Sequence, residues 1–230
     1  MIKVKRIVSI IAAAALCTAL AFPAGAAELP VTENAVSTVQ AQSTSPSKNF
    51  VGKKQIFYSS AYYSTDSGTK TKHRKIDLTG DNKNDTVKIK ATNSDDGFST
   101  KLTVTINGKK AFSKTLDTNV YVTYIRQSKS KEFLCIKSCT DNGYCATAGI
   151  YKYDKSTGKL KKVLSMDYAI GSYDPVTIKV TKSKLIITNT YRDWDKDIGA
   201  DGHIYCIKNK RVYKYKNGKF KLIKKTTKSI

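Results

Sequence analysis

Acidic side chains gather in two nine-residue windows of a chain that is otherwise strongly basic, and each window has oxygen-bearing side chains at its first, third, fifth and ninth positions. Ca²⁺ takes about six to eight oxygen ligands, and alternating side chains on a tight loop converge on one point. Like charges crowded together are unfavourable unless a cation neutralises them. We therefore predict two Ca²⁺ sites, with an Asx turn as the alternative at each window. The candidate ligands are Asp77, Thr79, Asp81 and Asp85 in the first window and Asp193, Asp195, Asp197 and Asp201 in the second.

Groups that could act on an organic ligand are few. Trp194, inside the second window, could stack on a sugar ring or fold back over its own loop. The chain has two histidines, and no nucleophile elbow, phosphate-binding loop or dinucleotide fingerprint is present. We predict a non-catalytic protein; the alternative is an envelope enzyme or enzyme inhibitor whose site carries no recognisable motif.

The residues around these windows predict β-strands. Polar and apolar residues alternate over 86–90 and 101–106, and the second segment ends at Asn107-Gly108, the strongest short hairpin signal. Similar turn pairs occur at Thr157-Gly158 and Asn217-Gly218. We predict an all-β fold of antiparallel sheets, in which each strand has one solvent-exposed face and one face buried in the core. Further strands are expected at 121–125, 132–138, 149–153, 159–164, 176–180, 184–190, 203–207, 211–215 and 219–224.

A weak internal repeat divides this β region. The segment 150–161 is echoed by 212–221, about 60 residues later, and each copy predicts a strand, a loop and a hairpin. Boundaries near Ser113 and Asp174 give three sheet units, with residues 50–72 as a candidate for a fourth.

The first acidic window resembles a known family. Residues Ile76 to Val87, followed by the hairpin that ends at Asn107-Gly108, are similar to the FG-GAP/VCBS-type repeats of secreted and surface proteins. The similarity is good over 74–113 and weaker over 190–224. The sequence departs from the family pattern at Thr79, a weaker ligand, and at Asn82, where the family has glycine. The resemblance implies a β-propeller, or a propeller-like stack of three to four blades, with Ca²⁺ holding a loop rigid.

The N-terminus predicts export. Lys3, Lys5 and Arg6 precede an apolar run over 7–22, and Ala24-Gly25-Ala26 is typical of a signal-peptidase site. We predict a signal peptide, helical in its apolar part, over 1–26. The apolar run is too short to span a membrane. A disordered Ser/Thr/Gln-rich spacer over 27–48 and an all-β repeat domain over 49–230 are expected to follow.

Four cysteines remain after the predicted cleavage, at positions 135, 139, 145 and 206. An even number in an exported chain predicts disulfides. Cys135 and Cys139 would lie about 13 Å apart on one strand face, too far to bond to each other. We expect Cys139 to pair with Cys145 across a hairpin loop, or either of them to pair with Cys206. Buried thiols are the alternative.

The net charge of the chain is +23, and removing the three basic residues of the signal peptide leaves +20. Such a field attracts polyanions weakly and in a salt-dependent way. We predict a secreted or wall-associated protein that binds anionic cell-wall polymers or polysaccharides. A specific nucleic-acid target is not expected, because arginine is scarce and no recognition motif is present. The alternative is that the lysines form only the solvated faces of strands.

Overall fold

The computed structural model of the protein describes residues 50–59, 68–140, 142–193 and 205–230. All of them belong to one compact unit. The predicted signal peptide, the whole predicted spacer, Trp194, Asp195, Asp197 and Asp201 lie outside the described residues.

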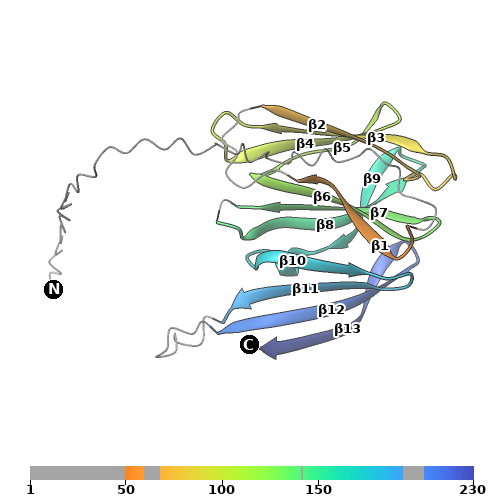
Figure 1. Cartoon of the computed structure of the whole chain (residues 1–230). Helices are drawn as coiled ribbons and strands as arrows, with labels where there is room; N and C mark the ends of the chain where they lie inside the picture. The colour runs from red at the N-terminus through yellow and green to blue at the C-terminus, as the bar shows by residue number, and fades with distance from the viewer. Residues whose placement is uncertain (1–49, 60–67, 141, 194–204) are drawn as a thin grey trace, which may run out of the picture. The chain divides into compact units, whose positions relative to one another are not determined.

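Thirteen strands and one 3₁₀ helix make up the described part of the chain (Figure 1). The predicted all-β fold is therefore confirmed. The strands are β1 (Lys53–Ser59), β2 (Thr69–Ile76), β3 (Asp85–Asn93), β4 (Ser99–Ile106), β5 (Lys109–Asp117), β6 (Asn119–Ser128), β7 (Lys131–Cys139), β8 (Cys145–Asp154), β9 (Lys159–Ser165), β10 (Tyr173–Val180), β11 (Leu185–Arg192), β12 (Cys206–Lys216) and β13 (Lys219–Ser229), and the helix is η1 (Asp167–Ala169).

The strands form three antiparallel sheets, which follow the chain order except for β1. The first sheet has the order β2-β3-β4-β5, the middle sheet β1-β6-β7-β8-β9 and the third sheet β10-β11-β12-β13. The division predicted near Asp174 agrees with the start of β10, whereas the one predicted near Ser113 falls inside β5, which continues to Asp117. The candidate fourth unit does not form from the described residues of 50–72, because β1 pairs with β6 while β2 pairs with β3.

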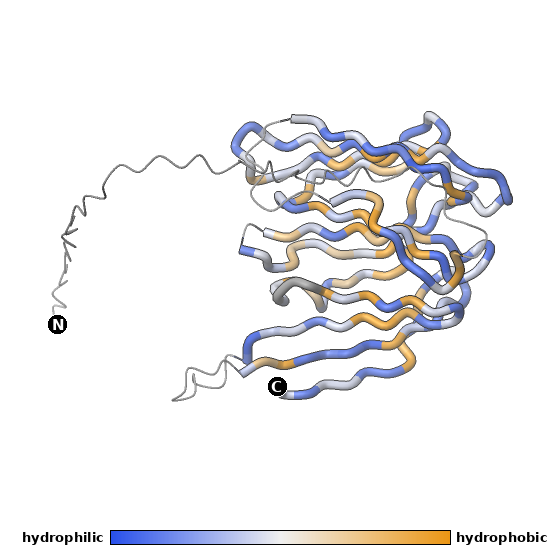
Figure 2. Tube along the Cα trace, in the orientation of Figure 1, coloured by the Kyte–Doolittle hydropathy of each residue, from blue (hydrophilic) through white to orange (hydrophobic). Residues whose placement is uncertain are grey.

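The middle sheet is buried on both faces, and this makes the unit a three-layer stack (Figure 1). Neighbouring residues of one strand pack into different cores. On β6, Tyr124 packs toward the first sheet and Ile125 toward the third; on β7, Leu134 packs toward the first sheet and Phe133 toward the third. Strands buried on both faces carry continuous apolar runs instead of an alternating pattern, as in the Phe133–Ile136 segment of β7. The hydrophobic stretches in Figure 2 accordingly concentrate in the inner strands.

The echoed sequence segments occupy equivalent places in two sheets. The β8–β9 hairpin has an irregularity between Ile150 and Tyr151, and the β12–β13 hairpin has one between Val212 and Tyr213, at the matching positions of the repeat. A β-bulge increases local twist and re-aims the side chains beside it. The predicted Asn-Gly turns also form, since Asn107 and Asn217 have φ values of 49° and 52°.

Candidate functional site

The loop over 77–84 joins β2 to β3 and is organised by its own carboxylates. Asp77 accepts three backbone N–H groups: those of Gly80 at 2.6 Å and Asp81 at 3.0 Å through Oδ1, and that of Asn82 at 2.9 Å through Oδ2. Asn82 has φ 70°, the left-handed conformation for which asparagine is the best substitute for glycine. Asparagine can therefore provide the turn at this position of the loop.

Asp85 begins β3 and is only 2% exposed. Its Oδ2 accepts the backbone N–H groups of Leu78 and Thr79, both at 2.8 Å. Its Oδ1 accepts the Thr79 hydroxyl at 3.3 Å and the Asn107 side-chain amide at 2.6 Å. Both oxygens are thus surrounded by donors, and the carboxylate ties the acidic loop to the β4–β5 turn. The Asn-Gly pattern predicts the turn at Asn107 but carries no signal for this second contact.

The first window fits a Ca²⁺ ion only in part. Both oxygens of Asp77 and of Asp85 already accept hydrogen bonds from the chain, whereas Asp81 is exposed at the rim of the loop. Asp81 accepts the backbone N–H of Lys83 at 2.9 Å, and this hydrogen bond lowers the pKa of its carboxyl. The described residues hold no group of three Asp, Glu, His or Cys side chains arranged for a metal. A cation at this loop has to compete with the backbone amides, so Ca²⁺ binding stays a prediction with a weak expected affinity.

The second window contributes one described residue. Asp193 follows β11, is 9% exposed and donates its backbone N–H to the carbonyl of Tyr205 at 2.8 Å. The other three candidate ligands and Trp194 stay predictions.

The disulfide prediction is wrong for this structure, because none of the four cysteines forms a disulfide. Cys139 and Cys145 are register partners on β7 and β8, as the hairpin argument expected, but their sulfurs are not at bonding distance. Cys206 belongs to β12, in a different sheet. Cys135 is buried among apolar side chains of the core between the middle and third sheets, and this burial raises the pKa of its thiol to about 12. Packing of the thiols replaces covalent cross-linking in the core.

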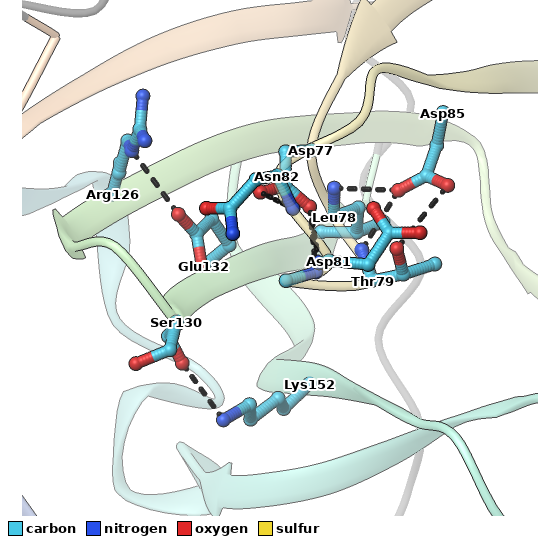
Figure 3. Close-up of polar contacts among 11 residues, drawn as sticks. Asp77, Leu78, Thr79, Asp81, Asn82, Asp85, Arg126, Ser130, Glu132 and Lys152 are labelled. Atoms are coloured by element: carbon cyan, nitrogen blue, oxygen red, sulfur yellow. Dashed lines mark hydrogen bonds and ion pairs between the residues drawn. The ribbon is translucent and has the colours of Figure 1, made fainter.

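A buried ion pair lies beside the acidic loop (Figure 3). Arg126 on β6 and Glu132 on β7 are cross-strand partners, and their Nε and Oε1 atoms are 3.1 Å apart. Glu132 is 1% exposed, and burial raises the pKa of its carboxyl to about 7, with Arg126 opposing and Asp77 reinforcing the rise. Nearby, Lys152 donates to the Ser130 carbonyl at 2.9 Å. Sequence analysis missed this cluster because β7 reads as an apolar strand with one glutamate.

Lysines form rows on the outer faces of the two outer sheets. On the third sheet, residues 208, 210, 214 and 216 of β12 are exposed, and all four are lysines. Three of them stand directly opposite lysines of β13: Lys208 faces Lys228, Lys214 faces Lys221 and Lys216 faces Lys219. Neither strand contains an acidic residue. Like charges directly opposite each other destabilise a sheet, and neither of these two strands supplies a counter-charge.

The outer face of the first sheet follows a different pattern. Lysines there alternate with hydroxyls across the strands: Lys90 faces Thr103, Lys101 faces Thr92, and Lys88 faces Thr105. The outer faces of the first and third sheets each contain a depression. The one on the first sheet has a volume of about 470 Å³ and the one on the third sheet about 550 Å³, and both are lined mainly by lysine and threonine. The two surfaces are called the first-sheet face and the third-sheet face below.

The fold and its surface define a class: an all-β protein of three stacked sheets with cationic outer faces. Comparison adds no family to this class, since no family model, curated protein or solved structure matches the chain. The resemblance to FG-GAP/VCBS-type repeats stays a prediction from residues 74–113. No helix among the described residues is long and apolar enough to cross a membrane.

Replacing Asp85 by alanine is expected to lower the free energy of unfolding by about 2–4 kcal/mol, because four donors lose their acceptor in a buried place. Urea denaturation measures the change. Asp95→Ala, in an exposed turn, is the matched control and is expected to shift stability by no more than about 0.5 kcal/mol. A loss below about 1 kcal/mol in Asp85→Ala would show that the carboxylate does not organise the loop.

The raised pKa of the Glu132 carboxyl predicts that the stability of the protein depends on pH. This pKa is raised above the unfolded value of 4.5 to about 7, so folding favours the protonated form. The stability it contributes is complete below pH 4.5 and is lost as the pH rises through 7, by at most about 3 kcal/mol. Urea denaturation between pH 5 and 8 is expected to show a flatter profile for Glu132→Gln than for wild type. Parallel profiles would contradict the assignment; Asp95→Asn controls for general charge effects.

Calorimetric titration with Ca²⁺ tests the metal prediction. We expect weak binding, with a Kd of about 0.1–1 mM, the range of extracellular modules. Asp81→Ala is expected to remove the contribution of the first window and Asp197→Ala that of the second, while Asp95→Ala leaves the heat unchanged. The absence of heat in the wild-type protein would rule out both sites.

Proposed function

We propose that this protein is a secreted, non-catalytic β-sheet module that binds anionic polymers of the cell envelope or extracellular matrix. The observation that carries the proposal is the set of directly opposed lysine pairs on β12 and β13. A polyanion on this face supplies the counter-charge that neither strand contains, and the repulsion between opposed amines is relieved on binding.

The distribution of acidic residues supports the same function. The described carboxylates lie mainly in turns, in the acidic loop or in the buried pair with Arg126, and the described side chains of the two outer faces include none. A solvated surface with no binding role usually mixes both signs of charge. A single-sign face instead focuses the field and raises the local concentration of counter-ions.

The predicted Ca²⁺ sites belong to this proposal as stabilisers of loops and not as part of the polymer-binding surface. The acidic loop lies against the β6–β7 turn, with Gly80 close to Ser130. Its carboxylates are therefore held at the end of the strands, away from the lysine rows.

Retention on immobilised polygalacturonate during a NaCl gradient tests the proposal. Wild-type protein is expected to bind at low salt and to elute as screening increases. A third-sheet variant, Lys214→Gln, Lys216→Gln, Lys219→Gln and Lys221→Gln, is expected to bind at least about tenfold more weakly. The same variant is expected to melt at an equal or higher temperature, because the repulsion between opposed lysines is removed.

A matched control carries four substitutions in lysines of the middle sheet and its β6–β7 turn: Lys53→Gln, Lys54→Gln, Lys129→Gln and Lys131→Gln. It has the same net charge as the third-sheet variant, so a much smaller loss of affinity is expected. Equal losses in the two variants would mean that net charge alone governs retention. Saturable binding that is insensitive to salt would contradict the electrostatic mechanism.

A further inference from the structure

We propose that the protein bridges two chains of an acidic polysaccharide, one on the first-sheet face and one on the third-sheet face. This inference rests on the proposed polymer binding and adds that one protein molecule has two polymer-binding faces. It depends on one feature of the fold, namely that two lysine-rich faces point in opposite directions from a common middle layer.

The opposite orientation follows from the two cores. Inward-facing residues of the first sheet, such as Val87 and Leu102, pack against one face of the middle sheet. Inward-facing residues of the third sheet, such as Tyr213 and Phe220, pack against its other face. Because side chains alternate between the faces of a strand, the lysines next to these residues must point away from the middle layer on both sides. Figure 1 shows the first and third sheets on opposite sides of β6–β9.

The spacing of the faces allows two polymer chains to bind at once. Stacked sheets lie about 10 Å apart, so the backbones of the two outer sheets are separated by about 20 Å. The Debye length at physiological ionic strength is about 8 Å. Two polyanions on opposite faces therefore repel each other weakly, and occupation of one face leaves the other available.

The chemistry of the faces favours a carboxylated polysaccharide over a simple polyphosphate. Lysine ammonium groups pair with carboxylates as charge-assisted hydrogen bonds. The hydroxyls between the lysines, such as Thr103 on the first sheet and Thr188 on the third, can exchange hydrogen bonds with sugar hydroxyls. A polyphosphate offers the charge but not the matching hydroxyl groups.

The two faces are expected to differ in strength. The first-sheet face places each of the lysines at positions 88, 90 and 101 opposite a threonine, whereas the third-sheet face holds opposed lysine pairs. A higher local density of positive charge releases more counter-ions on binding. The third-sheet face is therefore the stronger of the two and the more sensitive to salt.

A sandwich capture experiment tests bridging. Polygalacturonate is immobilised on a biosensor, the surface is saturated with protein, and a fluorescent galacturonate oligomer, too short to pass around the edge of the stack, is then injected at about 0.15 M NaCl. Wild-type protein is expected to capture the oligomer, because one face remains open. The middle-sheet control variant described above is expected to capture it to a similar extent.

Two single-face variants separate the possible outcomes. The first-sheet variant is Lys88→Gln, Lys90→Gln, Lys101→Gln and Lys110→Gln, and the third-sheet variant is the one defined above. Each is expected to bind the immobilised polymer through its intact face and to lose at least about 80% of the captured oligomer per bound protein. Circular dichroism and melting curves confirm that each variant is folded.

Each alternative result has a distinct meaning. If wild-type protein does not bind the immobilised polymer, the proposed function itself fails. If wild-type protein binds but captures no oligomer, or if both single-face variants capture it as wild type does, bridging is overturned. An equal loss of capture in the middle-sheet control would assign capture to net charge and overturn the role of the two faces. Stronger capture of polyphosphate of matched charge would overturn the assignment to polysaccharide.

Discussion

The burial of both faces of the middle sheet is the constraint on which the rest of the structure depends. A sheet with one apolar face needs one covering layer, but β6–β8 are apolar on both faces and need two. The first and third sheets supply these layers, each with one apolar face. Their other faces have no remaining partner inside the unit, and this is why the lysine rows stand exposed on opposite sides.

The same constraint explains where polar groups can be tolerated inside. Arg126 and Glu132 lie on strands of the doubly covered sheet, and each would be strongly destabilising there without the other. The attraction between the two charges offsets only part of the cost of burying the Glu132 carboxylate, since the pKa of Glu132 is still raised to about 7. The acidic loop contributes to this effect, because the carboxylate of Asp77 adds negative charge near the pair.

The lysines of the outer sheets have two possible roles, protection of strand edges and binding of a polyanion. Lysine blocks edge-to-edge association of strands, and β13 is an edge strand whose residues from position 221 onward are all exposed. That protective role accounts for some of the lysines. It does not require lysine directly opposite lysine on β12 and β13, an arrangement that costs stability within the sheet. The opposed pairs are therefore the part of the charge pattern that points to a polyanion partner.

Several features of the fold follow from local sequence alone. Alternation in β3 and β4, the Asn-Gly turns and the echo between 150–161 and 212–221 predict strands, hairpins and three sheet units, because strand pairing across a short turn depends on neighbouring residues. Local sequence also places the bend of the acidic loop at Asn82, whose φ of 70° agrees with the conformation expected there. The pattern of ligand-type residues, by contrast, did not reveal that Asp85 would be enclosed by donors.

Contacts between elements that are distant in the sequence were decided only by the tertiary structure. The side-chain bond from Asn107 to Asp85 spans 22 residues and requires the β4–β5 turn to lie beside the loop. The incorporation of β1 into the middle sheet and the packing of the cysteines as thiols likewise depend on which strands become neighbours. The sequence by itself determined a basic, β-rich chain with two acidic windows. The stacking of three sheets decided that its lysines form two opposed faces, because only a doubly buried middle layer requires a cover on each side.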